Sequence, residues 1–303
     1  MSIIKFLKGF KNEIILLGHD NIDCDSAISI LLMKRFLEYF DIKCRAVILD
    51  KNIHDTDIRI MKQFGVNLNY LKGEIKEDDA LFLLDHYKTT HGSNVVGCID
   101  HHPNQQNISY PFYINKNSAS TGKLIYDLML EYQYPISIIE IELVVLSIMV
   151  DTSSLKSTKC PPNHKEFVKK LIRDYSLDYD KFYSIGLCLS DLTKPLKKIV
   201  NEGVKTYMFR NVNLTSSYIQ VNENINAAEL THYIQNELLT ENMPLWIFLV
   251  HDFSTDSTTE YRISKSVIET FSYPQITSRG TNIIPHIEDN IEDIKKNLKI
   301  TER

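Results

Sequence analysis

Short apolar runs that end in an Asp or a His recur along this chain of 303 residues. Four segments follow such runs: GHDNIDCDS at residues 18–26, LDH at 84–86, DHHP at 100–103 and VDT at 150–152. Short apolar runs bounded by polar residues are typical of buried strands, and amphipathic stretches between them are typical of helices. Because the two kinds of segment alternate, the pattern constrains the chain to an α/β fold with a parallel sheet.

The first half of the chain predicts the individual elements of this sheet. Strands are expected at residues 13–18, 44–49, 80–84 and 95–99, and helices at residues 26–39, 58–64, 121–132 and 138–150. Ser26 is expected to cap the first helix, and Ser118, Ser120 or Thr121 the third. We expect helices on both faces of the sheet and a ligand site beyond the carboxyl ends of its strands. The run at 138–150 is too short for a membrane span, which favours a buried helix.

The second half predicts a smaller α/β domain. Residues 191–201 are polar, rich in lysine and interrupted by Pro195, which indicates a linker. Beyond it, strands are expected at residues 218–221, 245–250 and 260–263, and a helix at 227–239. We therefore expect one domain over residues 1–190 and a second over 202–303.

Composition and charge narrow the classes of partner. The net charge of −5 offers no basic groove for nucleic acid. The five cysteines are scattered, and none forms a CxxC pair, which indicates reduced thiols. Residues 1–11 are too short and too interrupted for a signal peptide. We expect a cytoplasmic protein without a membrane partner, and a homodimer is left open.

The first motif places His19, Asp23 and Asp25 at H-x3-D-x-D spacing. On a tight turn after a strand, this spacing can direct all three side chains into one pocket. Carboxylate oxygens combined with an imidazole suit Mn²⁺ or Co²⁺, with Mg²⁺ as an alternative. The competing interpretation is a solvated turn in which one Asp caps a helix.

The remaining motifs add carboxylates and imidazoles. Asp85 has two oxygens that can bridge two metals, and the segment Asp100, His101, His102 offers a ligand, an orienting group and a proton donor. Asp151 can complete a second ligand set. Each Asp taken alone could be an ordinary end of a strand or helix. Together they predict two divalent metals side by side, a site that activates water against phosphate esters or anhydrides.

Three other histidines and one late segment carry weaker signals. His86 is either a partner of a ligand or part of a turn, and His54 and His91 are expected at the surface. The segment SRG at residues 278–280 combines a hydroxyl with a guanidinium, which suits a phosphate. A surface loop is the competing interpretation of that segment.

Taken in order, these motifs resemble those of the DHH phosphoesterase superfamily. Within it they are most similar to the subfamily of family II (manganese-dependent) inorganic pyrophosphatases and cytosolic exopolyphosphatases. The family motifs read GHxNPDxDS, VDH, DHH and SDT, followed near the end by SRKKQxxP. The last is matched here by SRGTNIIP at residues 278–285.

The resemblance implies two bound metals, most often Mn²⁺. His19 and Asp23 would bind the first metal, and Asp25, His101 and Asp151 would bind the second. Asp85 would bridge the two. Water or hydroxide held between the metals is the nucleophile in this family.

The resemblance also implies the contacts with substrate. His102 would face the substrate and donate a proton to the leaving phosphate, and Asp100 would orient His101. The smaller C-terminal domain would close over the cleft and bring Ser278 and Arg279 to the distal phosphate. Lys194 is a candidate for a further family lysine that binds phosphate.

The chain departs from the family pattern at several positions. Ile22 replaces a Pro, and Gly280 and Thr281 replace two phosphate-binding lysines. We therefore predict a two-metal phosphoanhydride hydrolase, with pyrophosphate as the first substrate and short polyphosphate as the alternative. A nucleotide phosphodiesterase is disfavoured because no GGGH-like segment is present. A non-catalytic phosphate-binding protein is favoured by the missing lysines and opposed by the complete ligand set.

Overall fold

The chain forms two compact units in the computed structural model, which describes residues 2–49, 53, 55–91, 94–103, 108–223 and 225–300. Unit 1 comprises Met1–Leu155 and Cys160–Gly186, and unit 2 comprises Lys156–Lys159 and Leu187–Arg303. His54, expected at the surface, lies outside the described residues.

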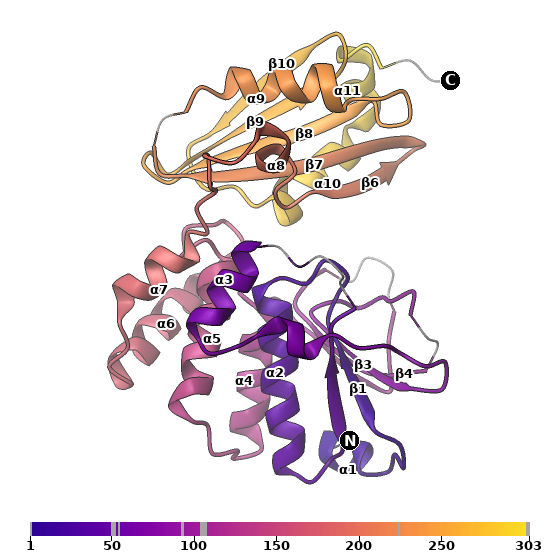
Figure 1. Ribbon diagram of the computed structural model, residues 1–303, viewed down its shortest axis with the longest axis vertical. Coiled ribbons are helices and arrows are strands. Elements are labelled where there is room, and N and C mark those ends of the chain that lie inside the picture. Colours follow the sequence, from indigo (N-terminus) through magenta and orange to yellow (C-terminus); the bar gives the residue numbers. More distant parts are fainter. Residues whose placement is uncertain are drawn as a thin grey trace. The chain divides into compact units, whose positions relative to one another are not determined.

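Unit 1 contains a five-stranded parallel sheet, which confirms the predicted α/β class (Figure 1). The strands follow the order β2-β1-β3-β4-β5. Their bounds are β1 Ile14–Leu17, β2 Cys44–Val47, β3 Ala80–Leu84, β4 Val95–Asp100 and β5 Phe112–Asn115. Because all five strands run in the same direction, the loops that follow β1, β3 and β4 leave the sheet at one edge.

Helices flank this sheet. They are α1 Ile3–Leu7, α2 Cys24–Tyr39, α3 Asp55–Gln63, α4 Thr121–Glu131, α5 Ile138–Asp151, α6 Pro162–Asp174 and α7 Tyr179–Gly186, with a 3-10 turn at Leu68–Leu71. Figure 1 shows α2, α4 and α5 beside one another, and α2 also packs on β1, β2 and β3. Helix α5 confirms the predicted buried helix, and Ser137 and Glu140 close its start as a capping box.

The start of α2 differs from the prediction. Asp23, not Ser26, is the N-cap residue, and its carboxylate accepts a hydrogen bond from the Ser26 backbone N–H. The Ser26 hydroxyl instead accepts a hydrogen bond from the His19 backbone N–H at 3.2 Å. Both contacts fold the turn between β1 and α2 back on itself, so Asp23 and Asp25 lie at the helix start.

Apolar side chains fill the sheet face opposite α2. Ile15, Leu17, Leu81, Leu83 and Cys98 alternate with residues that face the helices, as parallel strands buried on two faces require. Side chains from connecting segments, among them those of Tyr87 and Tyr110, pack against this cluster. The edge of the sheet that carries the motifs is thereby held by a rigid core.

Unit 2 contains a mixed sheet in the order β10-β9-β8-β7-β6. The strands are β6 Lys205–Phe209, β7 Val212–Val221, β8 Leu245–Asp252, β9 Ser257–Ile263 and β10 Ile268–Tyr273, and only the β7–β8 pair is parallel among the described strands of this sheet. The helical segments are α8 Leu196–Val200, α9 Ala227–Tyr233, α10 Ile284–Asp289 and α11 Ile291–Asn297, with π-helical turns at Ile234–Leu238 and Arg279–Ile283.

Two apolar clusters hold unit 2 together. One contains Ile199, Val200 and Phe248, and the other contains Leu214 and Ile287. The segment 191–201, expected as a linker, thus contains a short helix whose residues Ile199 and Val200 are buried in unit 2. Among the described residues, none of the helices is both long and apolar enough to cross a membrane.

Candidate metal centre

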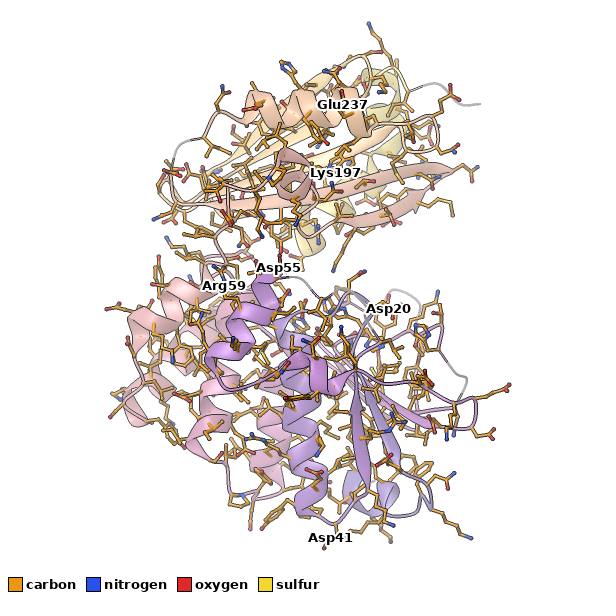
Figure 2. The ribbon with its side chains drawn as sticks, viewed as in Figure 1. Asp20, Asp41, Asp55, Arg59, Lys197 and Glu237 are labelled. Carbon is orange, nitrogen blue, oxygen red and sulfur yellow. The ribbon has the colours of Figure 1, made fainter. Side chains whose placement is uncertain are left out.

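The predicted ligands meet at the carboxyl edge of the parallel sheet in unit 1. His19 follows β1, Asp85 follows β3, His101 follows β4, and Asp151 is the last residue of α5. In Figure 2, Asp20 marks this end of unit 1, and Asp41, which follows α2, marks the opposite end.

Three overlapping groups of side chains have ligand atoms within 4.8 Å of one another. The groups are His19, Asp23 and Asp85; Asp25, His101 and Asp151; and Asp85, His101 and His102. The structure therefore brings all six predicted metal ligands together. Asp85 belongs to the first and the third group, so it links the two ligand sets.

The first group is arranged around the imidazole of His19. Its Nε2 lies 3.4 Å from Asp23 Oδ2 and 3.4 Å from Asp85 Oδ2. Its Nδ1 lies 2.7 Å from the backbone carbonyl oxygen of Asp20. Since a carbonyl can only accept, Nδ1 carries the proton and Nε2 faces the carboxylates. A histidine that binds a metal through Nε2 needs this tautomer, and it usually has this kind of outer partner.

The second group is arranged around His101, which is buried. Its Nε2 lies 3.3 Å from Asp151 Oδ2, 3.5 Å from Asp85 Oδ1 and 3.9 Å from Asp25 Oδ2. Its Nδ1 lies 2.9 Å from the carbonyl oxygen of Ser118, which fixes the same tautomer as in His19. Ser118, one of three candidates for the cap of α4, therefore orients a candidate ligand through its backbone, and Ser120 is the cap.

Several carboxylates lie close together in this site, and their negative charges repel one another unless a cation or a proton is bound. Burial raises the pKa of Asp25, and the neighbouring carboxylates of Asp85 and Asp151 raise it further. Burial acts against protonation of His19, but Asp23 and Asp85 outweigh it and raise the pKa of His19 well above its usual value. Carboxylates that repel one another and an imidazole that gains a proton form a donor set that a divalent cation would satisfy, with release of protons. The residues present therefore fit a pair of divalent metals.

Asp100 differs from its expected role. Its Oδ1 accepts from the His102 backbone N–H at 3.1 Å and lies 2.8 Å from His102 Nδ1, so it orients His102 and not His101. The reason is local, because a carboxylate readily bonds the backbone two residues later in a turn. Asp100 is fully buried, whereas the side chain of His102 is 40% exposed. The imidazole of His102 is thereby held at Nδ1, while the side chain as a whole stays partly exposed.

Two further histidines lie beside the first ligand group. His86 Nδ1 lies 3.0 Å from the Leu84 carbonyl oxygen, and burial lowers the pKa of His86 to about 4. His91, expected as a plain surface residue, lies with Nε2 3.1 Å from Asp20 Oδ1 and is partly exposed. His91 therefore contacts Asp20, the residue whose carbonyl oxygen orients His19. No local sequence pattern predicts this contact, because the two residues are far apart in the chain.

The candidate phosphate-binding residues lie in unit 2. Ser278 caps the turn Arg279–Ile283 by accepting from the Thr281 backbone N–H. Arg279 Nη1 donates to the carbonyl oxygens of Gly203 and Ser216, and its guanidinium lies 5.0 Å from the Tyr218 ring centroid. Lys194 Nζ lies 3.9 Å from Glu202 Oε1. Ser278 and Arg279 thus sit on one ordered turn, and Lys194 has an acidic neighbour.

Comparison with known proteins finds a family match in the first part of the chain and two similar folds. Residues 13–156 match the DHH family, N-terminal domain. A Methanococcus jannaschii protein, provisionally described as a family II inorganic pyrophosphatase, superposes with a TM-score of 0.71 at 20% identity, over 91% of this chain and 98% of that one. An exopolyphosphatase-related protein from Bacteroides fragilis superposes with a TM-score of 0.50 at 18% identity, over 97% and 96% of the two chains. No curated protein sequence matches this chain. At these identities the two structures share the fold with this chain.

Proposed function

Because the chain carries a DHH family N-terminal domain over residues 13–156, we propose that it is a two-metal phosphoanhydride hydrolase that uses Mn²⁺ and cleaves pyrophosphate. One observation carries the proposal. Asp85 turns Oδ2 toward His19 at 3.4 Å and Oδ1 toward His101 at 3.5 Å, so one carboxylate serves two ligand sets. A carboxylate shared in this way would hold two cations close enough to act on one phosphoryl group.

The two ligand sets divide the site. His19 and Asp23 would hold one metal, Asp25, His101 and Asp151 would hold the other, and Asp85 would contact both. When bound, such a pair polarises the phosphoryl group and lowers the pKa of water to near neutral.

The proton donor is assigned to His102. Its Nδ1 is held by Asp100 and its side chain is partly exposed, so Nε2 is the atom proposed to give a proton to the departing phosphate. Asp100 is a positioning residue for this step. Ser278 and Arg279, with Lys194 as a further candidate cation, are proposed to bind the phosphate that leaves.

Short-chain polyphosphate is the alternative substrate. A Cβ at Gly280 would meet no described atom within 4 Å, so the turn that carries Arg279 has open space where the family pattern has a lysine. Fewer cations around a terminal phosphate favour a less restrictive site. The similarity to both a pyrophosphatase-like and an exopolyphosphatase-related fold is compatible with either substrate.

Phosphate release with Mn²⁺ from pyrophosphate, tripolyphosphate and long-chain polyphosphate, measured in parallel, tests the proposal. We expect pyrophosphate to be the best substrate. Asp85→Asn should lower kcat by roughly 10³-fold, since several kcal/mol of transition-state stabilisation depend on the metals. Asp41→Asn, at the opposite end of unit 1, is the matched control and should keep full activity (Figure 2).

Three results would change the assignment. A preference for tripolyphosphate or longer chains would replace pyrophosphatase by exopolyphosphatase. Full activity of Asp85→Asn would refute the two-metal mechanism. No release from any of the three substrates would refute phosphoanhydride hydrolysis.

A further inference from the structure

Thr121, the first residue of α4, contacts two of the candidate metal ligands. Its hydroxyl donates to Asp85 Oδ1 at 2.9 Å, and its backbone N–H donates to Asp25 Oδ2 at 2.7 Å. Thr121 is completely buried, and the two carboxylates that it contacts are buried too. The metal-binding motifs do not include it, and the sequence indicates only a helix cap at this position.

The backbone contact belongs to the helix start. The first N–H groups of a helix have no partner within the helix and carry partial positive charge. Thr121 N and Gly122 N donate to the two different oxygens of Asp25, at 2.7 and 3.0 Å. This pair of bonds fixes the plane of the Asp25 carboxylate. The Ser29 hydroxyl also donates to Oδ1 at 3.5 Å, so the lone pair left for a cation is on Oδ2, the oxygen 3.9 Å from His101 Nε2.

The hydroxyl contact with Asp85 is not part of the hydrogen bonding at the helix start. Asp85 has a left-handed backbone with a φ of 69°, and its carboxylate must present a different oxygen to each ligand set. The Thr121 hydroxyl bonds only Oδ1, the oxygen that faces His101. A donor on one oxygen fixes the rotation of the carboxylate, so Oδ2 stays directed at His19.

We propose that Thr121 is a positioning residue that holds Asp85 in the orientation that bridges two metals. The inference rests on the proposed two-metal site and deepens it. The Ser120 hydroxyl provides the contrast, since it accepts from the Lys123 backbone N–H and contacts Ser147 without touching a candidate ligand. Loss of the Ser120 hydroxyl should therefore weaken only the helix, whereas loss of the Thr121 hydroxyl should alter the metal pair.

The test is Mn²⁺ titration followed by electron paramagnetic resonance and calorimetry on the full chain. Thr121→Val keeps the shape of the side chain and removes the hydroxyl. Thr121→Ser keeps the hydroxyl. Thr121→Ala differs from Thr121→Ser only in lacking the hydroxyl. Ser120→Ala is the helix-cap control. The Ser and Ala variants decide the question if the Val variant does not fold.

We expect wild type, Thr121→Ser and Ser120→Ala to bind two Mn²⁺ with the spectrum of an exchange-coupled pair. Thr121→Val and Thr121→Ala should bind the second Mn²⁺ about tenfold to a hundredfold more weakly, with the spectrum of isolated ions. Wild-type affinity and coupling in both hydroxyl-free variants would overturn the inference, as would fewer than two Mn²⁺ on the wild type. If the wild type binds the coupled pair but releases no phosphate, the proposed reaction fails and the inference on Thr121 stands or falls by the titration alone.

Discussion

His251 is a buried histidine in unit 2, and its surroundings destabilise its protonated form. Its Nδ1 lies 3.0 Å from the Thr258 hydroxyl, which itself accepts from the Thr277 backbone N–H. Thr258 therefore has its own proton left to donate to Nδ1. Burial, and next the positive charge of Arg279, lower the pKa of His251 from 6.5 to about 4. The neutral ring thus supports the strand-to-turn connection just before Ser278.

This pKa predicts that acid destabilises the protein through His251. The unfolded chain takes up the proton near pH 6.5 and the folded chain only near pH 4, so stability is fully present above 6.5 and is lost as the pH falls to about 4. The loss is on the order of 3 kcal/mol in the free energy of unfolding. The free energy of unfolding, measured with urea at several pH values between 4 and 6.5, should depend less steeply on pH in His251→Gln than in the wild type. The exposed residue His232, changed to Gln, is the control, and an unchanged slope in His251→Gln would contradict the assignment.

Spacing along the chain identifies the candidate ligands but not the groups that hold them. Asp23 and Asp25 lie close to His19 in sequence, so a local pattern indicates that they share a turn. The contacts of Thr121 with Asp25 and Asp85 span 96 and 36 residues, and no local pattern encodes them. The spacing of residues also could not decide between Asp23 and Ser26 as the helix cap, because both side chains can accept a backbone hydrogen bond.

At the scale of elements, strands with a buried apolar run are predicted well, and these include the edge strand β2, whereas edge strands without such a run are not. The strands β1 and β3 consist of apolar residues that are all buried, which gives the run that identifies a central parallel strand. The edge strands β5 and β6 are half-buried or exposed and lack such a run. The predicted helix at 227–239 is confirmed in its extent, and its last part differs only in geometry, because α9 continues directly into the π-helical turn Ile234–Leu238.

The π-helical turn Arg279–Ile283 offers a direct test of the phosphate-binding proposal. Gly280 has open space around it and no left-handed backbone, so a side chain fits there. We expect Gly280→Lys to raise kcat/KM for pyrophosphate by about tenfold, since one charge-assisted hydrogen bond contributes about 1.5–3 kcal/mol. Gly280→Gln, of similar length and without charge, should leave kcat/KM unchanged. Equal gains in both variants, or none in either, would remove the turn from the substrate site.

At the scale of the whole molecule, the chain does not divide into two continuous segments. It leaves unit 1 after Leu155, returns at Cys160 and leaves again after Gly186. Thr158 ties the short segment Lys156–Lys159 into unit 2, because its backbone N–H donates to the Ile276 carbonyl and its hydroxyl accepts from the Ser278 backbone N–H. A sequence predicts linkers from local composition, so an insertion of four residues held by distant partners leaves no signal.

Metal binding should therefore stabilise unit 1 alone. The six candidate ligands belong to unit 1, whereas Trp246, the single tryptophan of the chain, is buried in unit 2 and reports on that unit by fluorescence. A metal at a hundredfold excess over its Kd adds about 2.7 kcal/mol to the folded state. That raises Tm by roughly 5–10 °C for a unit of this size. Since α2, α4 and α5 lie in unit 1, Mn²⁺ should raise the Tm seen by far-UV circular dichroism, leave the fluorescence Tm unchanged, and lose its effect with EDTA or in Asp85→Asn. An equal rise in the fluorescence Tm would show that the two units unfold as one.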